Sequence, residues 1–112
     1  SIMMKLIIAI VQDQDQNELS RAFYDANVRA TKLSTTGSFL RAGNTTFMIG
    51  IEEERIEEVL KIIDQCSKAR EQYVSAPLHL DMGLDSAVNL PVKVEVGGAT
   101  VFVLPIESFH QF

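Results

Sequence analysis

The run MKLIIAIV at residues 4–11 is almost continuously apolar. Apolar side chains on both faces of a strand are typical of a central strand that is covered on each side, within the domain or across an interface. The sequence therefore predicts a central strand here, and the other elements are arranged around it. The three residues before Met4 are interpreted as a vector remnant and are left out of the predicted fold.

Helical periodicity predicts two helices. Apolar residues recur every three or four positions over residues 16–26, and again from Ile56 onward, after the glutamates at 52–54. Asp15, followed by Glu18, is the predicted N-cap of the first helix with its capping-box partner. The acidic residues before Ile56 favour a helix start, because negative charge is stabilised at that end of the helix dipole.

Strand patterns account for much of the rest of the chain. The predicted strands cover residues 28–34, 44–51, 71–76, 92–96 and 100–104. The last two are separated by Gly97-Gly98-Ala99, which is typical of a hairpin turn. Residues 77–91 contain two prolines, one glycine and little periodicity, and are predicted to form a long loop. The fold class is α+β, a ferredoxin-like βαββαβ order with an extra β-hairpin or long loop before the last core strand.

Composition limits the function classes. The 112 residues suffice for a single domain over 1–112, and 46% hydrophobic residues fit a folded chain. A net charge of −5 argues against a nucleic-acid partner, and an RNA-recognition domain would need more central-strand aromatics than Phe47. One cysteine fits a reducing compartment. No apolar run approaches the roughly 20 residues of a membrane span, so a cytoplasmic protein without membrane insertion is expected.

The candidate binding segment is RATKLSTTGSFLRAGNTTFMIG, residues 29–50. It contains three cationic side chains, several hydroxyl groups and three glycines, but no aspartate or glutamate. A local positive potential can hold an anion although the net charge opposes it. The pair Phe39-Leu40 offers an apolar surface to a flat ring. A ligand with phosphates and bases is favoured, and an ordinary polar hairpin with a glycine-rich turn stays open as the alternative.

The sequence gives little support for an active site. Cys66 falls on the apolar side of the second helix, where a free cysteine usually packs as a small hydrophobe. His79 and His110 lack the spacing of a metal site, and a helix start explains Asp13 and Asp15. The glycine-rich segment matches neither the Walker A nor the dinucleotide-binding motif. The chain is therefore predicted not to be an enzyme and to need no cofactor or metal.

Three stretches resemble a known family: IIAIVQDQD (7–15), RATKLSTTGSFLRAGNTTF (29–47) and VEVGGATVFVLPIESFHQF (94–112). They are similar to the PII-like cyclic di-AMP receptors of the PstA or DarA type, within the PII signalling superfamily. The resemblance implies a PII-like homotrimer that binds one cyclic di-AMP at each subunit interface and relays it through loop rearrangement to an unidentified downstream protein. The alternative is an ATP-sensing PII-type regulator of a transporter or enzyme, which should need a longer loop than residues 35–43.

The resemblance also implies a set of binding residues. Asn44 would read an adenine edge, Phe39 and Leu40 would pack on base faces, and Thr31 and Gly50 would supply hydrogen bonds. The implied pocket residues are Arg29, Ala30, Thr31, Phe39, Leu40, Asn44, Gly50, Phe102 and Gln111. The sequence departs from the family at Ser38, where a glycine is expected, and over residues 78–90, onto which nothing is carried over.

Overall fold

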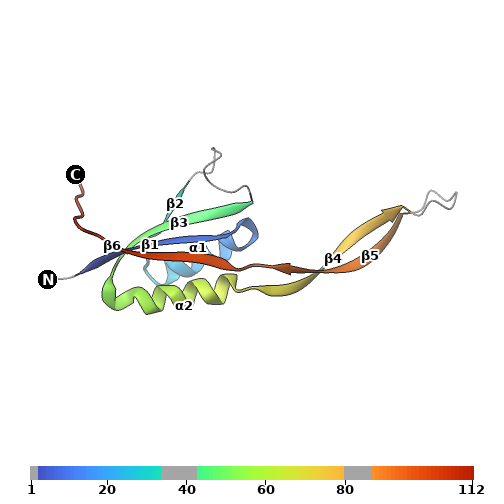
Figure 1. The fold of residues 1–112 in the computed structure, drawn as a ribbon, viewed down its shortest axis with the longest axis horizontal. Coiled ribbons are helices and arrows are strands. Elements are labelled where there is room, and N and C mark those ends of the chain that lie inside the picture. Colours follow the sequence, from blue (N-terminus) through green and yellow to red (C-terminus); the bar gives the residue numbers. More distant parts are fainter. Residues whose placement is uncertain (1–2, 34–42, 80–86) are drawn as a thin grey trace.

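The computed structural model describes residues 3–33, 43–79 and 87–112 (Figure 1). In chain order the elements are β1 (Met4–Gln12), the 3-10 turn η1 (Asp13–Asp15), α1 (Gln16–Asp25), β2 (Thr31–Leu33), β3 (Asn44–Glu52), the 3-10 turn η2 (Glu53–Arg55), α2 (Ile56–Ser67), β4 (Arg70–His79), β5 (Ala87–Val96) and β6 (Ala99–Pro105). No helix in these parts of the chain is long and apolar enough to cross a membrane.

The strand β1 lies inside a four-stranded sheet, as its apolar run predicts. The strand order is β2-β3-β1-β6, and each neighbouring pair is antiparallel. Ile7 of β1 lies opposite Ile49 of β3 on one side and Val103 of β6 on the other. The predicted ferredoxin-like order of core strands and helices is thereby confirmed.

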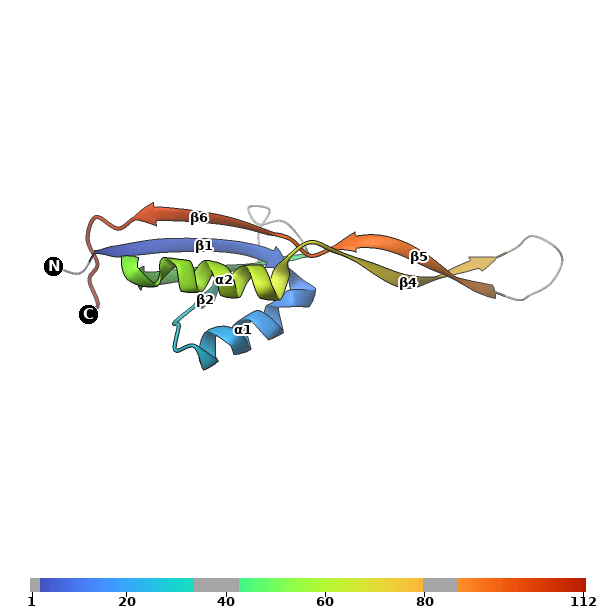
Figure 2. The same cartoon turned by 90° about the horizontal axis from the view of Figure 1, so that it is seen from below.

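Both helices cover the same face of this sheet (Figure 2). The side chains of β1 alternate, so Ile7, Ala9 and Val11 point into the core beneath the helices. Phe23 of α1 meets Phe47 of β3 edge to face, with 5.6 Å between the ring centroids. The remaining buried apolar residues of the core are Leu19, Val28, Ile49, Ile51, Val59 and Ile63.

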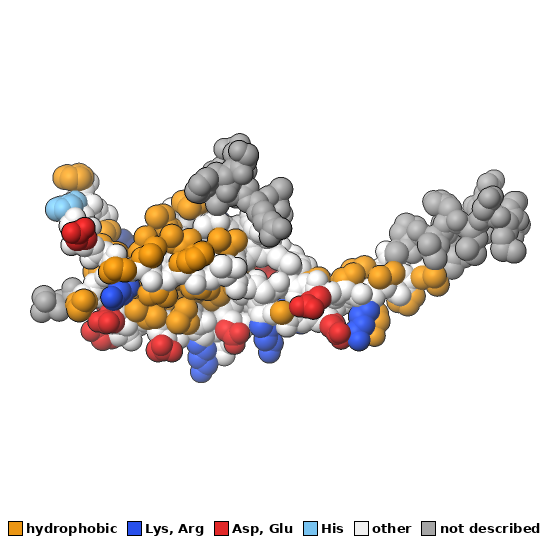
Figure 3. All heavy atoms as spheres, in the orientation of Figure 1, with side chains coloured by type: hydrophobic (Ala, Val, Ile, Leu, Met, Phe, Trp, Pro, Cys, Tyr) orange, Lys and Arg blue, Asp and Glu red, His pale blue; other side chains and the backbone are white. Residues whose placement is uncertain are grey.

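The other face of the sheet carries apolar side chains that no described helix covers. We call it the open face; its residues are Leu6, Ile8, Ile10, Met48, Phe102 and Leu104. Met48 is 36% exposed, Phe102 51% and Leu104 41%. Figure 3 shows apolar side chains, in orange, gathered over this side of the sheet. The second apolar face of β1 is therefore uncovered in a single chain.

The strands β4 and β5 form a separate two-stranded antiparallel sheet, which we call the ribbon. It runs from Arg70 opposite Val96 to His79 opposite Ala87. The ribbon extends away from the four-stranded sheet and gives the chain its long dimension of 73 Å (Figure 1). The long loop predicted over residues 77–91 is thus wrong for the described part of that range. Both strands are edge strands, and an edge strand tolerates Pro77 and Pro91, which lack an N–H group.

The hairpin predicted at Gly97-Gly98 is also wrong. β5 pairs with β4, whereas β6 pairs with β1, so these glycines join two different sheets. Their φ angles are +84° and +94°, in the left-handed region that favours glycine. The N–H of Gly98 donates to the carbonyl of Ser67, which holds the end of α2 against this crossing point.

Asp15 is the N-cap residue of α1, as predicted, but the capping hydrogen bond expected of its side chain is not formed, and η1 precedes the helix. The Asp15 carboxylate is buried and instead pairs with Arg70 at 2.7 Å. At the N-terminus, the carbonyl of Met3 accepts a hydrogen bond from the N–H of Glu53 at 2.9 Å, so this residue takes part in the fold.

Candidate ligand-binding site

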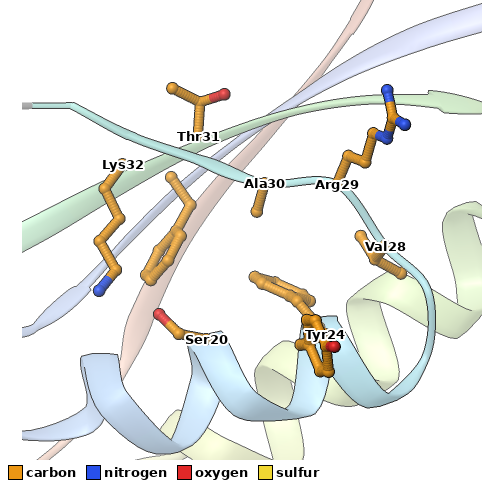
Figure 4. Close-up of a pocket in the computed structure, with 9 residues that line it drawn as sticks. Ser20, Tyr24, Val28, Arg29, Ala30, Thr31 and Lys32 are labelled. Carbon is orange, nitrogen blue, oxygen red and sulfur yellow. The ribbon is translucent and has the colours of Figure 1, made fainter.

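Three of the predicted site residues lie on the segment that enters β2. Side chains alternate along it: Ala30 and Lys32 point toward α1, and Arg29 and Thr31 point away (Figure 4). Thr31 lies opposite Met48 of β3, which places it on the side of the open face. The alternation predicted for this strand is therefore present, although the strand is shorter than predicted.

A cavity of about 330 Å³ lies between this segment and α1 (Figure 4). Lys32 holds its ammonium group 6.0 Å from the centre of the Phe47 ring. The hydroxyl of Ser20 is buried and has no hydrogen-bond partner among the described residues. The lining residues are Ser20, Phe23, Tyr24, Val28, Arg29, Ala30, Thr31, Lys32 and Phe47. Aromatic surface with two nearby cations suits a ligand that combines a flat ring with negative charge.

Phe102 lies at the opposite edge of the sheet. Thr31, Met48, Ile8 and Phe102 follow one another in register across the four strands. Adjacent strands are about 4.8 Å apart, so Thr31 and Phe102 are roughly 14 Å apart. Within one chain these two predicted site residues are not brought together.

Gly50 lies in the next row of the open face. It is opposite Leu6 of β1, which in turn is opposite Leu104 of β6. Gly50 is exposed, and a Cβ atom added to it would meet nothing within 4 Å. Its backbone is accessible to a ligand on the open face, as a hydrogen-bonding role requires.

Asn44 opens β3 opposite Gln12, the last residue of β1. The two residues line a second cavity of about 310 Å³. Its other lining residues are Ile10, Val11, Gly97, Gly98, Ala99 and Thr100. The polar groups are neutral amides, backbone groups and a hydroxyl. Such groups suit the edge of a base better than a phosphate.

The sequence prediction of the site did not include Gln12, although it lies within the stretch IIAIVQDQD. Its importance depends on its position opposite Asn44 and on the return of the chain at Gly97, neither of which a local pattern gives. Gln111 is exposed in the segment after β6, and Phe39 and Leu40 lie outside the described residues, as does Ser38.

Groups suited to catalysis are not gathered in the described parts of the chain. Burial raises the pKa of the Cys66 thiol, and the carboxylates of Glu18 and Asp15 raise it further. A raised pKa leaves less of the nucleophilic thiolate at neutral pH. Among the described residues, no three His, Cys, Asp or Glu side chains are grouped to hold a metal ion.

A family model described as "Cyclic-di-AMP receptor" matches residues 4–112. The chain is similar to the crystal structure of a functionally unknown protein from Pediococcus pentosaceus, with 55% identity, a TM-score of 0.77 and full coverage of both chains. It is also similar to the PII protein of Arabidopsis thaliana in its complex with citrate. That match has 16% identity and a TM-score of 0.53, covers 95% of this chain and 77% of the other, and shows the PII fold alone.

Proposed function

Because this chain belongs to the cyclic-di-AMP receptor family, we propose that it is a non-enzymatic signal transduction protein that binds the second messenger cyclic di-AMP. The proposal includes a homotrimer with one ligand at each subunit interface, a cytoplasmic location and an unidentified downstream protein. Family membership supports the ligand. The placement of the candidate residues supports the position of the site.

The main support for a site between two subunits is the position of Thr31 and Phe102 at opposite edges of one sheet. Ile8 and Met48 lie between them on the open face. A compact ligand can contact both candidate residues if the β2 edge of one subunit lies beside the β6 edge of the next. A site shared by two subunits therefore explains a separation that a single-chain site leaves unexplained.

The open face supports the oligomer independently. Large contiguous apolar patches are uncommon on monomers and mark interaction surfaces. Ile8, Met48 and Phe102 form a continuous apolar row there, and Phe102 is 51% exposed. A closed ring of identical subunits covers the same patch on every copy. We therefore assign the open face to contacts between subunits.

The chemistry of the cavities fits the parts of cyclic di-AMP, which has two phosphates and two adenines. Arg29, which points away from α1 as Thr31 does (Figure 4), supplies positive charge beside β2. Phe102 exposes a ring on which a base can stack. The amide of Asn44 can donate to and accept from one adenine edge. Guanine presents a different donor and acceptor pattern, so the site should discriminate by base.

Calorimetry on one sample with cyclic di-AMP, cyclic di-GMP and ATP tests the ligand. We expect cyclic di-AMP to bind, and cyclic di-GMP to bind at least about a hundredfold more weakly, which corresponds to roughly 2.7 kcal/mol. Affinity should fall only moderately with salt, because few charges are involved. Equal affinity for the two dinucleotides would contradict base reading by Asn44. Binding of ATP alone would favour the ATP-sensing PII-type regulator instead.

Mixing two defective variants tests the interface. Arg29→Ala and Phe102→Ala should each weaken binding when pure. If each site takes Arg29 from one subunit and Phe102 from the next, a mixture of the two variants that is unfolded and reassembled regains a fraction of intact sites. Gln65→Ala, an exposed position on α2, serves as the control variant. Failure of the mixture to regain any binding would place both residues in a single-chain site.

A further inference from the structure

The four residues that follow the apolar part of β1, Gln12-Asp13-Gln14-Asp15, contact both the start of β3 and the base of the ribbon. We call them the junction. The cavity lined by Gln12 and Asn44 lies beside the junction, and it also reaches Gly97, the residue that follows the ribbon. The hydrogen bonds and the ion pair of the junction are separate from the apolar contacts that build the core.

The junction holds the start of β3 through Asp13. The N–H of Asp13 donates to the carbonyl of Gly43 at 3.0 Å. The hydroxyl of Thr45 donates to the Asp13 carboxylate at 2.6 Å. Asn44 lies between these two anchored residues and opposite Gln12. The position of Asn44 is therefore tied to the junction on both sides.

The junction also holds both strands of the ribbon at their base. The N–H of Gly97, just after β5, donates to the side-chain oxygen of Gln12 at 2.7 Å. Arg70, the first residue of β4, donates to the buried Asp15 carboxylate through both terminal nitrogens, at 2.7 and 3.4 Å. This hydrogen bond raises the pKa of Arg70 above its usual value. Arg70 lies directly opposite Val96, so one pair of strand ends is fixed from two points.

We propose that Gln12 is a positioning residue that couples ligand binding at Asn44 to the conformation of the ribbon. Its side chain reaches both places. It lines the cavity with Asn44, and its oxygen accepts the N–H of Gly97. A ligand group in this cavity alters the hydrogen bonding of the Gln12 side chain. The hydrogen bond from Gly97, the residue that leads from the ribbon to β6, changes with it.

The remainder of the ribbon is suited to respond. A two-stranded sheet is only marginally stable by itself in water. Tyr73 is 68% exposed and Val92 41% exposed, so these two side chains bury little apolar surface between the strands. Lys93 pairs with Glu71 at 2.9 Å, but both side chains are more than half exposed, and such surface pairs contribute little. The contacts at the base are therefore a large share of what fixes the ribbon.

Backbone hydrogen exchange with and without saturating cyclic di-AMP tests this role, which rests on the proposed function. In the wild type we expect exchange at residues 72–74 and 92–94 to slow by about tenfold on binding, within the usual range of coupling between sites. In Gln12→Ala, at ligand concentrations that saturate it, this slowing should be lost. The matched control is Gln14→Ala. Gln14 donates to the same Gln12 oxygen at 2.7 Å and, among the described residues, makes no hydrogen bond to Asn44 or the ribbon, so its response should equal the wild type.

Each result decides between the proposals. Calorimetry on the same samples first establishes whether cyclic di-AMP binds; absence of binding refutes the proposed function and this role with it. Binding without a response of the wild-type ribbon overturns only the coupling. An undiminished response in saturated Gln12→Ala also overturns it. In the apo protein, faster exchange of the Gly97 amide in Gln12→Ala than in Gln14→Ala is expected, and equal rates would show that Gln12 does not hold the ribbon base.

Discussion

The two glycines between β5 and β6 allow a matched test of how tightly the ribbon base is packed. Both have positive φ angles, +84° at Gly97 and +94° at Gly98. Alanine at either position should therefore lose about 1–2 kcal/mol of folding free energy through left-handed strain. The surroundings differ. A Cβ at Gly97 would lie 2.5 Å from the Lys68 carbonyl oxygen and 2.5 Å from an Arg70 nitrogen, whereas one at Gly98 would meet nothing within 4 Å.

The difference in unfolding free energy between the two variants measures the cost of the close contacts at Gly97. The Lys68 oxygen belongs to the backbone and the Arg70 group is held by Asp15, so neither moves aside freely. Overpacking of this kind costs typically about 1–3 kcal/mol. Gly97→Ala should thus lose about that much more stability than Gly98→Ala. Urea unfolding at one protein concentration measures both, because oligomer stability depends on concentration. Equal losses would refute the close packing of Gly97 against the end of α2.

Three further outcomes are expected. Asn44→Ala should weaken cyclic di-AMP binding by about 1–3 kcal/mol through an unpaired polar group, and should leave the apo melting temperature nearly unchanged; a lower melting temperature with unchanged affinity would make Asn44 a turn residue. Light scattering should give about three times the chain mass of 12.5 kDa, and a monomer mass would contradict the covered open face. Because burial raises the Cys66 pKa, iodoacetamide should modify this thiol more slowly than a free cysteine at pH 8, with the gap closing as pH rises above the raised value; mass spectrometry measures the rates.

Periodic elements that face the core could be predicted from the sequence. β1 and α2 were predicted because burial imposes a regular apolar pattern on each, and the structure confirms them. The ribbon was not predicted over its full length. Neither of its faces packs on the core, so no alternation is imposed on residues such as Val74 and Lys93. Its pairing depends on contacts between two separated segments, and Pro77 and Pro91 point locally to a loop.

The candidate site was predicted in part for the same reason. The segment from Arg29 could be recognised from its charge and glycine content, and it lines a cavity. Local patterns could not give the partner of Asp15, because a helix cap and an ion pair with a residue 55 positions later share one sequence signature. The contact from Gln12 to Gly97 spans 85 positions and is likewise visible only in the fold.

The ribbon follows α2 and precedes β6, and its two ends lie side by side, since Arg70 and Val96 are direct partners. An insertion whose two ends are adjacent can change in length without displacing the elements that flank it. The registers of β1 with β3 and β6 involve no residue of the ribbon. The ribbon is therefore a modular insertion: evolution or an engineer can exchange it for another hairpin with adjacent ends and keep the four-stranded sheet unchanged.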